Sequence, residues 1–319
     1  MSRRPKEVDK CTKSNESHRI MVVGTMSSGK STLINAIIGR ELLPSANEAT
    51  TACIVNICHD KNAKTFSGAC FDASGNKIAA SHSASINTVK EWNNKKNVKH
   101  ICLTGRFFGK NIQKSDLALN DTPGPNYSQD KLHGEIMLEA LQKNSFNTLI
   151  YILDVSQLGI NDDRNILYDV RKKIAESNNI KIYFILNKID LLDPEKGEDR
   201  NKYIEQSRLY LENAGFSSPV IIPVMAYTAL TVRKALVREP MTRTQQLVLE
   251  AHLDGISDDP AFLGISKLQH AAILIIRLLI GKALQHRIIR NRKLKKLELF
   301  SGITTIERIC FQCKEEVIK

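Results

Sequence analysis

Short apolar runs alternate with amphipathic segments over much of the chain. Apolar runs rich in β-branched residues predict strands, and they lie at 19–24, 52–58, 100–107, 115–124 (running into a turn), 147–155, 180–190 and 219–226. Helical spacing predicts helices at 31–39, 85–95, 162–177 and 199–215, and the polar stretch 59–82 predicts a loop. Apolar strands that alternate with helices are typical of an α/β fold, with a mostly parallel sheet and helices on both faces.

The pattern changes after about residue 230, where strand signals stop. Residues 241–253 and 261–299 have helical character. At the other end of the chain, the N-terminal residues are polar. We therefore expect a disordered polar tail at 1–18, an α/β domain at 19–235 and a smaller helical region at 236–319.

Composition and charge narrow the classes of partner. The chain has 319 residues and a formal net charge of +12, which favours an anionic partner such as a nucleotide, a nucleic acid or a membrane surface. It has no apolar run of the roughly 20 residues that a spanning helix needs, and its N-terminus has no apolar signal-peptide core. Seven cysteines without a pairing pattern predict reduced thiols and a cytoplasmic protein. Cys310 and Cys313 have no second ligand pair, so a C-terminal helix or tail is favoured over a zinc site.

A glycine-rich loop lies between the first strand and the first helix. Gly24 and Gly29 are followed by Lys30 and Ser31, which is the spacing of a phosphate-binding loop. Backbone N–H groups and the helix N-terminus bind phosphate, Lys30 reaches the β- and γ-phosphates, and the Ser31 hydroxyl ligates Mg²⁺. The nucleotide-binding residues expected here are Gly24, Ser27, Ser28, Gly29, Lys30, Ser31 and Thr32.

A second motif, "NKID", ends the strand at 180–190. Asp190 can accept hydrogen bonds from N1–H and the exocyclic amine of guanine, a donor pair that adenine lacks. Asn187 is expected to tether the loop, and the stem of Lys188 to lie over the base. A third motif, "DTPG", follows another strand: Asp121 is expected to hold the Mg²⁺ site, and the Gly124 N–H to contact the γ-phosphate. An ordinary turn is the alternative for this motif.

The stretches "GTMSSGKSTLINAIIGRELLP" and "SANEATTA" resemble the dynamin family, and the similarity covers about residues 19–235. The resemblance implies the P-loop NTPase fold and GTP hydrolysis. It also implies that Thr51 is a switch threonine that ligates Mg²⁺ when γ-phosphate is present, with Thr50 as the competing candidate. The separation of about 70 residues between Thr51 and Asp121 also resembles dynamins more than compact ribosome-assembly GTPases.

Two further stretches, "LNDTPGPNYSQDKLHGEIMLEAL" and "LIYILDVSQLGINDDRNIL", resemble the bacterial dynamin-like branch that includes a replication-clamp-binding protein. Ser27 matches the dynamin serine that organises a monovalent cation and the attacking water, which makes Ser27, Lys30 and Thr51 the implied catalytic residues. Met26 replaces the dynamin glutamine, and Pro125 stands where small regulatory GTPases have a catalytic glutamine.

The resemblance and these departures leave two functions open. The first is a Mg²⁺-dependent GTPase that is slow until it forms a homodimer through the nucleotide face. The second is a GTP-regulated binding module with negligible turnover that recruits a DNA-replication or membrane partner. In a loose match at "PVMAYTAL", Ala226 would offer its N–H to guanine O6.

The C-terminal region carries a basic segment at 286–296. Its cations recur every three residues, at Arg287, Arg290, Lys293 and Lys296. They predict contact with an anionic membrane or DNA, which would make the protein peripheral to the membrane or nucleoid-associated. The alternative, a neck helix that leads towards a stalk, is favoured, and we expect the chain to lack most of that stalk. "QLVLE" at 246–250 resembles a clamp-binding peptide without its terminal aromatic residue.

Overall fold

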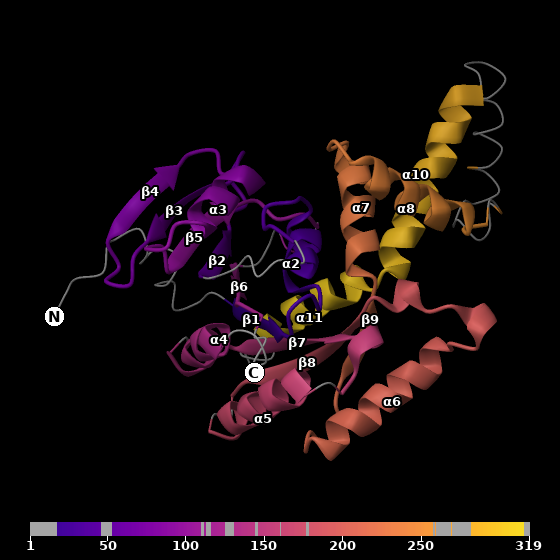
Figure 1. Cartoon of the computed structure of the whole chain (residues 1–319). Coiled ribbons are helices and arrows are strands. Elements are labelled where there is room, and N and C mark those ends of the chain that lie inside the picture. Colours follow the sequence, from indigo (N-terminus) through magenta and orange to yellow (C-terminus); the bar gives the residue numbers. More distant parts are fainter. Residues whose placement is uncertain are drawn as a thin grey trace.

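One mixed β-sheet forms the centre of the molecule (Figure 1). The computed structural model describes residues 18–45, 53–109, 112, 116–124, 131–143, 146–159, 161–176, 179–257, 259, 269 and 282–315. Within these ranges the sheet has nine strands in the order β4-β3-β5-β2-β6-β1-β7-β8-β9. The strands are β1 (His18–Gly24), β2 (Ile54–His59), β3 (Ser67–Phe71), β4 (Lys77–Ser81), β5 (His100–Gly105), β6 (Leu117–Asp121), β7 (Thr148–Asp154), β8 (Lys181–Asn187) and β9 (Ile221–Val224).

The strands that carry the three motifs run parallel. β1 pairs with β6 and β7, and β8 pairs with β7 and β9, all in parallel register. Their carboxyl ends therefore meet at one edge, which brings together Gly24, Asp121, Asp154 and Asn187. Ligands of open α/β sheets bind at this edge. The prediction of a mostly parallel sheet is therefore confirmed for the strands that carry the motifs.

The prediction of a loop at 59–82 is wrong. These residues contain the antiparallel hairpin β3–β4, which pairs through β3 with β5 and extends the sheet beyond β2. β3 is the short sequence "SGACF" and β4 is an edge strand with exposed positions. Small residues have weak strand preference, so this hairpin depends on pairing with β5 and not on its own pattern.

Helices cover both faces of the sheet, as predicted. The helices of the described residues are α2 (Lys30–Ile38), α3 (Ile86–Asn93), α4 (Lys131–Lys143), α5 (Asn161–Ala175), α6 (Arg200–Asn213), α7 (Ala226–Val237), α8 (Arg243–Asp254), α10 (Lys282–Phe300) and α11 (Ile303–Glu315), of which α8 and α10 pack on α7 and not on the sheet. Along β1, Ile20 and Val22 face a core shared with α2, α7 and α11, whereas Met21 and Val23 face a core shared with α4, α5 and α6. This alternation explains why strands buried on both faces are apolar throughout.

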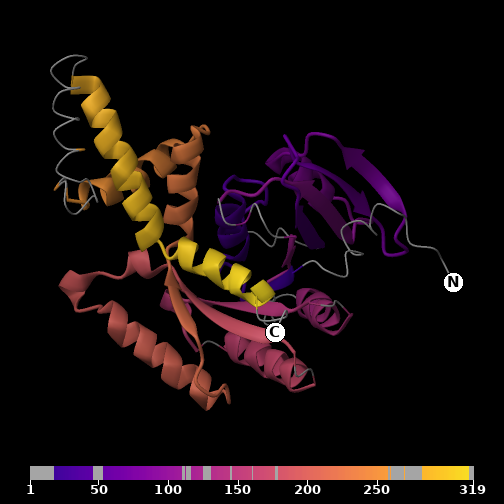
Figure 2. The ribbon, with the colours of Figure 1, turned by 180° about the vertical axis from the view of Figure 1, so that it is seen from behind.

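The C-terminal helices pack on each other and on the α/β part. Val232 of α7, Leu249 and Leu253 of α8, and Leu294 and Leu297 of α10 form a small core of their own. Figure 2 shows α10 running from its distal end towards the sheet and α11 continuing along it. Ile303 and Ile306 of α11 enter the main core. The division at residue 235 stays a prediction, since α11 contacts β1, β9 and α2.

Gly302 lies at the bend between α10 and α11. Its φ of 80° is left-handed, and a Cβ there would collide with the carbonyl oxygen of Pro223. Cys310 and Cys313 lie in α11, as the helix alternative predicts, but their side chains are outside the described set. In the described residues, no helix is long and apolar enough to cross a membrane.

The cysteines differ from expectation at one position. Cys53, Cys70 and Cys102 are free and buried, in line with reduced thiols. Cys58 is disulfide-bonded, so the expectation of reduced thiols is wrong for this residue.

A buried arginine links the end of α2 to the C-terminal helices by hydrogen bonds. Arg233 of α7 is fully buried and donates to Ala36 O at 2.6 Å, Glu298 Oε1 at 3.0 Å and Glu307 Oε1 at 2.5 Å. Its guanidinium carbon lies 4.9 Å from the ring centroid of Phe108. One side chain therefore joins α2, α7, α10 and α11.

Replacing Arg233 with methionine is expected to cost about 3 to 5 kcal/mol of unfolding free energy, because two carboxylates would lose their buried partner. Burial already raises the pKa of Glu307, and Arg233 opposes that shift. As a control, Arg208→Met breaks the surface pair with Glu205 and is expected to cost less than about 1 kcal/mol. Urea unfolding measures both, and equal losses would contradict the role of Arg233.

Candidate nucleotide-binding site

The predicted phosphate loop lies between β1 and α2 at the carboxyl edge of the sheet. Gly29 precedes α2 with a left-handed φ of 98°, and a Cβ there would collide with the side-chain amide of Asn187. The Asn187 Nδ2 donates to Ser28 O at 2.9 Å. The "NKID" motif therefore holds the phosphate loop directly, as expected of a tether.

Lys30 points into the loop that it follows. It is 7% exposed, and its Nζ donates to Gly24 O at 3.0 Å and Thr25 O at 2.7 Å. Burial lowers the pKa of the Lys30 ammonium to about 8, and the Asp121 carboxylate opposes the shift. The group stays mostly protonated at neutral pH, and its two carbonyl bonds can be exchanged for stronger bonds to phosphate oxygens.

Ser31 and Asp121 come together, although 90 residues separate them. The Ser31 hydroxyl donates to Asp121 Oδ2 at 2.9 Å, whereas Asp121 Oδ1 is buried and has no hydrogen-bond partner among the described residues. Burial raises the pKa of Asp121 to about 6, against the effects of Lys30 and Ser31. An unpartnered buried carboxylate oxygen beside a serine hydroxyl fits a hard cation such as Mg²⁺, or a water bound to it.

The turn after β6 lies against the phosphate loop. A Cβ at Gly124 would meet the Lys30 ammonium and would come within 2.9 Å of Met26 Cα. Thr122 Oγ1 donates to Val22 O at 2.8 Å and fixes the start of the turn on β1. Only glycine fits this close approach, which agrees with a backbone N–H directed at a terminal phosphate.

Of the other residues predicted to lie near the phosphates, the structure describes some and not others. Ser27 is exposed, with a left-handed φ of 61°, and Thr32 lies in the first turn of α2. Thr50, Thr51 and Pro125 lie outside the described residues, so their roles stay predictions.

On the base side, Lys188 has a partner that the motif did not reveal. Its backbone is left-handed, with φ 65°, and its Nζ forms a 2.6 Å ion pair with Asp154 Oδ2 at the end of β7. Asp154 is paired with Asn187 in the sheet register. The only sequence signal for Asp154 was its position as the polar residue that ends an apolar strand.

Asp190 and Asn187 both connect to the start of α7. Asp190 Oδ2 accepts from Thr228 Oγ1 at 2.8 Å, and Asn187 Oδ1 accepts from the Ala226 N–H at 3.1 Å. Asp190 keeps partial exposure, so a base can reach it. The Ala226 N–H is already bonded, so its predicted donation to guanine O6 would have to share or replace that bond, and it stays a prediction.

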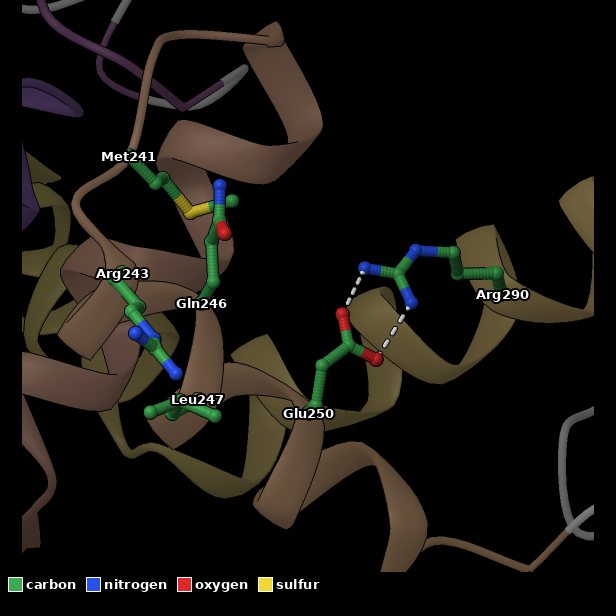
Figure 3. A pocket seen from close by; sticks show the side chains of 6 residues that line it. All are labelled: Met241, Arg243, Gln246, Leu247, Glu250 and Arg290. Carbon is green, nitrogen blue, oxygen red and sulfur yellow. Dashed lines mark hydrogen bonds and ion pairs between the residues drawn. The ribbon is translucent and has the colours of Figure 1, made fainter.

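The basic segment is partly neutralised within the chain. Arg290 of α10 forms two hydrogen bonds with Glu250 of α8, at 2.9 and 2.6 Å (Figure 3). Lys293 Nζ donates to Leu253 O at 3.3 Å. α8 packs beside α10 and supplies a carboxylate to Arg290, and contact of the segment with an anionic membrane or DNA stays a prediction. Arg287 is exposed.

The clamp-like stretch 246–250 lies within α8. Leu249 is fully buried and Leu247 is 62% exposed, so recognition as an extended peptide would require α8 to unfold. A hollow of about 460 Å³ lies beside it (Figure 3), lined by Met241, Arg243, Gln246, Leu247, Glu250 and Arg290.

Comparisons with known proteins place the site in a family. The model of the dynamin family matches residues 20–189, more than half of the chain. No curated protein matches the chain.

Solved structures give the fold. One of an oligomerised bacterial dynamin pair, described as a mechanism for long-range sensing and tethering of membranes, matches with a TM-score of 0.52 and 17% identity. The match covers 98% of this chain and 50% of that chain, so this chain spans about half the length of that structure. Aquifex aeolicus Era Y63A bound to GDP and AlF₄⁻ matches more weakly, with a TM-score of 0.35 and 16% identity, covering 72% of this chain and 58% of that one. On the family match, this chain belongs to the dynamin family, as a dynamin-like GTP-binding protein with the P-loop NTPase fold.

Proposed function

We propose that the chain hydrolyses GTP with Mg²⁺ and that hydrolysis is coupled to nucleotide-dependent self-association. The observation that carries the proposal is the cluster of Lys30, Ser31 and Asp121. It combines a buried ammonium, a serine hydroxyl and a buried carboxylate oxygen without a partner. This set matches the charge and geometry of a Mg²⁺-bound triphosphate.

Each residue then has a definite task. Lys30 gives up its carbonyl partners and binds the β- and γ-phosphates. Ser31 and Asp121 hold the Mg²⁺ site, with Thr51 completing it in the triphosphate state. Bound Mg²⁺ neutralises charge that develops on the phosphate oxygens. The Gly124 N–H contacts the γ-phosphate, and Asp190 selects guanine.

Among the residues that the structure describes, no side chain at the site is an evident candidate to position water. Met26 replaces the dynamin glutamine and lies against Gly124. We infer that a second copy, docked across the nucleotide face, orders the loops around Ser27 and Thr51 and excludes water. A monovalent cation at Ser27 would assist, as in dynamins. The oligomerised bacterial dynamin pair that this chain resembles supports self-association.

Localisation follows from the same proposal. We expect a cytoplasmic protein that reaches an anionic membrane, or DNA, through exposed cations of 286–296 such as Arg287. Screening should make such contact sensitive to salt. A replication clamp is the least supported partner, because Leu249 is buried.

The second candidate is a GTP-regulated binding module with negligible turnover, which recruits a DNA-replication or membrane partner. The absence of a glutamine at Met26 favours it. The intact Lys30, Ser31 and Asp121 cluster favours the enzyme.

Sedimentation tests the assembly step. The protein is expected to be monomeric with GDP and to dimerise with GDP and aluminium fluoride, because only the transition-state geometry engages the loops on both sides of the γ-phosphate. A variant with Arg287, Lys293 and Lys296 changed to glutamine is the control and should dimerise normally. A monomer with every nucleotide would favour the binding module.

A further inference from the structure

The base-recognition carboxylate is linked to a helix outside the nucleotide motifs. Thr228, in the first turn of α7, is fully buried and donates its hydroxyl hydrogen to Asp190 Oδ2 at 2.8 Å. His252 of α8 places its Nε2 at 3.4 Å from the same hydroxyl oxygen. Asp190, Thr228 and His252 therefore form a chain from the nucleotide site to the C-terminal helices.

Donor and acceptor rules fix the direction of this chain. A carboxylate can only accept, so the Thr228 hydroxyl is the donor in the bond to Asp190. His252 Nδ1 lies 2.8 Å from Val248 O, which also can only accept, so Nδ1 carries a hydrogen. Thr228 has a single hydroxyl hydrogen, and the shorter distance directs it to Asp190. A neutral ring, whose Nε2 can only accept, therefore contacts Thr228 by packing, and Nε2 donates to Oγ1 only when both ring nitrogens carry a hydrogen.

A fixed carboxylate is what guanine recognition requires. The N1–H and exocyclic amine of guanine lie in one plane, so Asp190 binds both only if its carboxyl group keeps a definite rotation. Asp190 is partly exposed, and the bond from Thr228 fixes one of its oxygens. The His252 ring packs against that hydroxyl and helps to hold Thr228 in place.

We propose that Thr228 is a positioning residue for base selectivity, which orients Asp190, and that His252 supports it from α8. The proposal rests on guanine binding at Asp190. It adds that packing of a C-terminal helix contributes to the choice of base, a role that the four-residue motif does not contain.

The test compares binding of GDP and IDP by fluorescence titration. IDP lacks the exocyclic amine, so the ratio of the two affinities measures the second hydrogen bond to Asp190. Thr228→Val removes the hydroxyl at similar volume and is expected to lower the GDP/IDP ratio about tenfold. Thr228→Ser, which keeps the hydroxyl, should restore the wild-type ratio, and His252→Ala should lower it about threefold.

A purely structural role for Thr228 would weaken both nucleotides equally and leave the ratio unchanged, which would overturn the proposal. In an Asp190→Ala background, Thr228→Val should have no further effect on the ratio, because there is no carboxylate to orient. A further loss there would also contradict it. If Thr228→Val does not fold, the His252→Ala ratio decides. Failure of the wild-type protein to bind GDP would instead reject the proposed function.

Discussion

Lys30→Ala is expected to lower affinity for GTP about a thousandfold, on the order of 4 kcal/mol. Two charge-assisted hydrogen bonds to phosphate oxygens are lost, and each is worth about 1.5 to 3 kcal/mol. The buried Asp121 also loses the cation that lowers its pKa. Titration with a fluorescent GTP analogue in the presence of Mg²⁺ measures the change.

Lys90→Ala, which removes an exposed lysine from α3, is the matched control and should bind GTP normally. Thermal unfolding should show that both variants are folded. An unchanged affinity in folded Lys30→Ala would mean that the phosphates bind elsewhere, and it would remove the basis for the proposed chemistry.

Asp190→Asn is expected to weaken GTP binding about a hundredfold and to improve XTP binding. The asparagine amide presents a donor where the carboxylate accepted from guanine, and xanthine offers an acceptor at that position. Wild-type protein should bind ATP far more weakly than GTP, because adenine lacks the two donors. Competition titrations with GTP, XTP and ATP measure all three preferences.

Asp199→Asn is the control for that change, because Asp199 is an exposed helix cap in the same part of the chain and asparagine caps almost as well. It should leave all three affinities unchanged. Equal binding of ATP and GTP by the wild-type protein would contradict the assignment of Asp190.

The strands and the nucleotide-binding motifs could be predicted from the sequence, because each depends on a local pattern of residues. Gly24, Lys30, Asp121 and Asn187 each follow or end an apolar strand, and parallel strands bring their carboxyl ends together. The motifs and the strand pattern therefore agreed on one edge of the sheet, and the contacts of Asn187 with both Ser28 and Ala226 lie there.

What the sequence could not predict depends on partners far along the chain. Thr228 lies 38 residues from Asp190, and Glu250 lies 40 residues from Arg290. No pattern around these residues specifies such pairing. The hairpin β3–β4 was missed for the same reason, because its small residues become strands only through pairing with β5.

The rate of GTP hydrolysis per protein molecule, measured over a wide range of protein concentration, tests whether hydrolysis is coupled to assembly. With Mg²⁺ and potassium present, we expect a low rate in dilute protein that rises with concentration and levels off, with no turnover by Lys30→Ala at any concentration. A rate that is independent of concentration would contradict assembly-coupled hydrolysis, and absence of turnover at every concentration would contradict the enzyme itself.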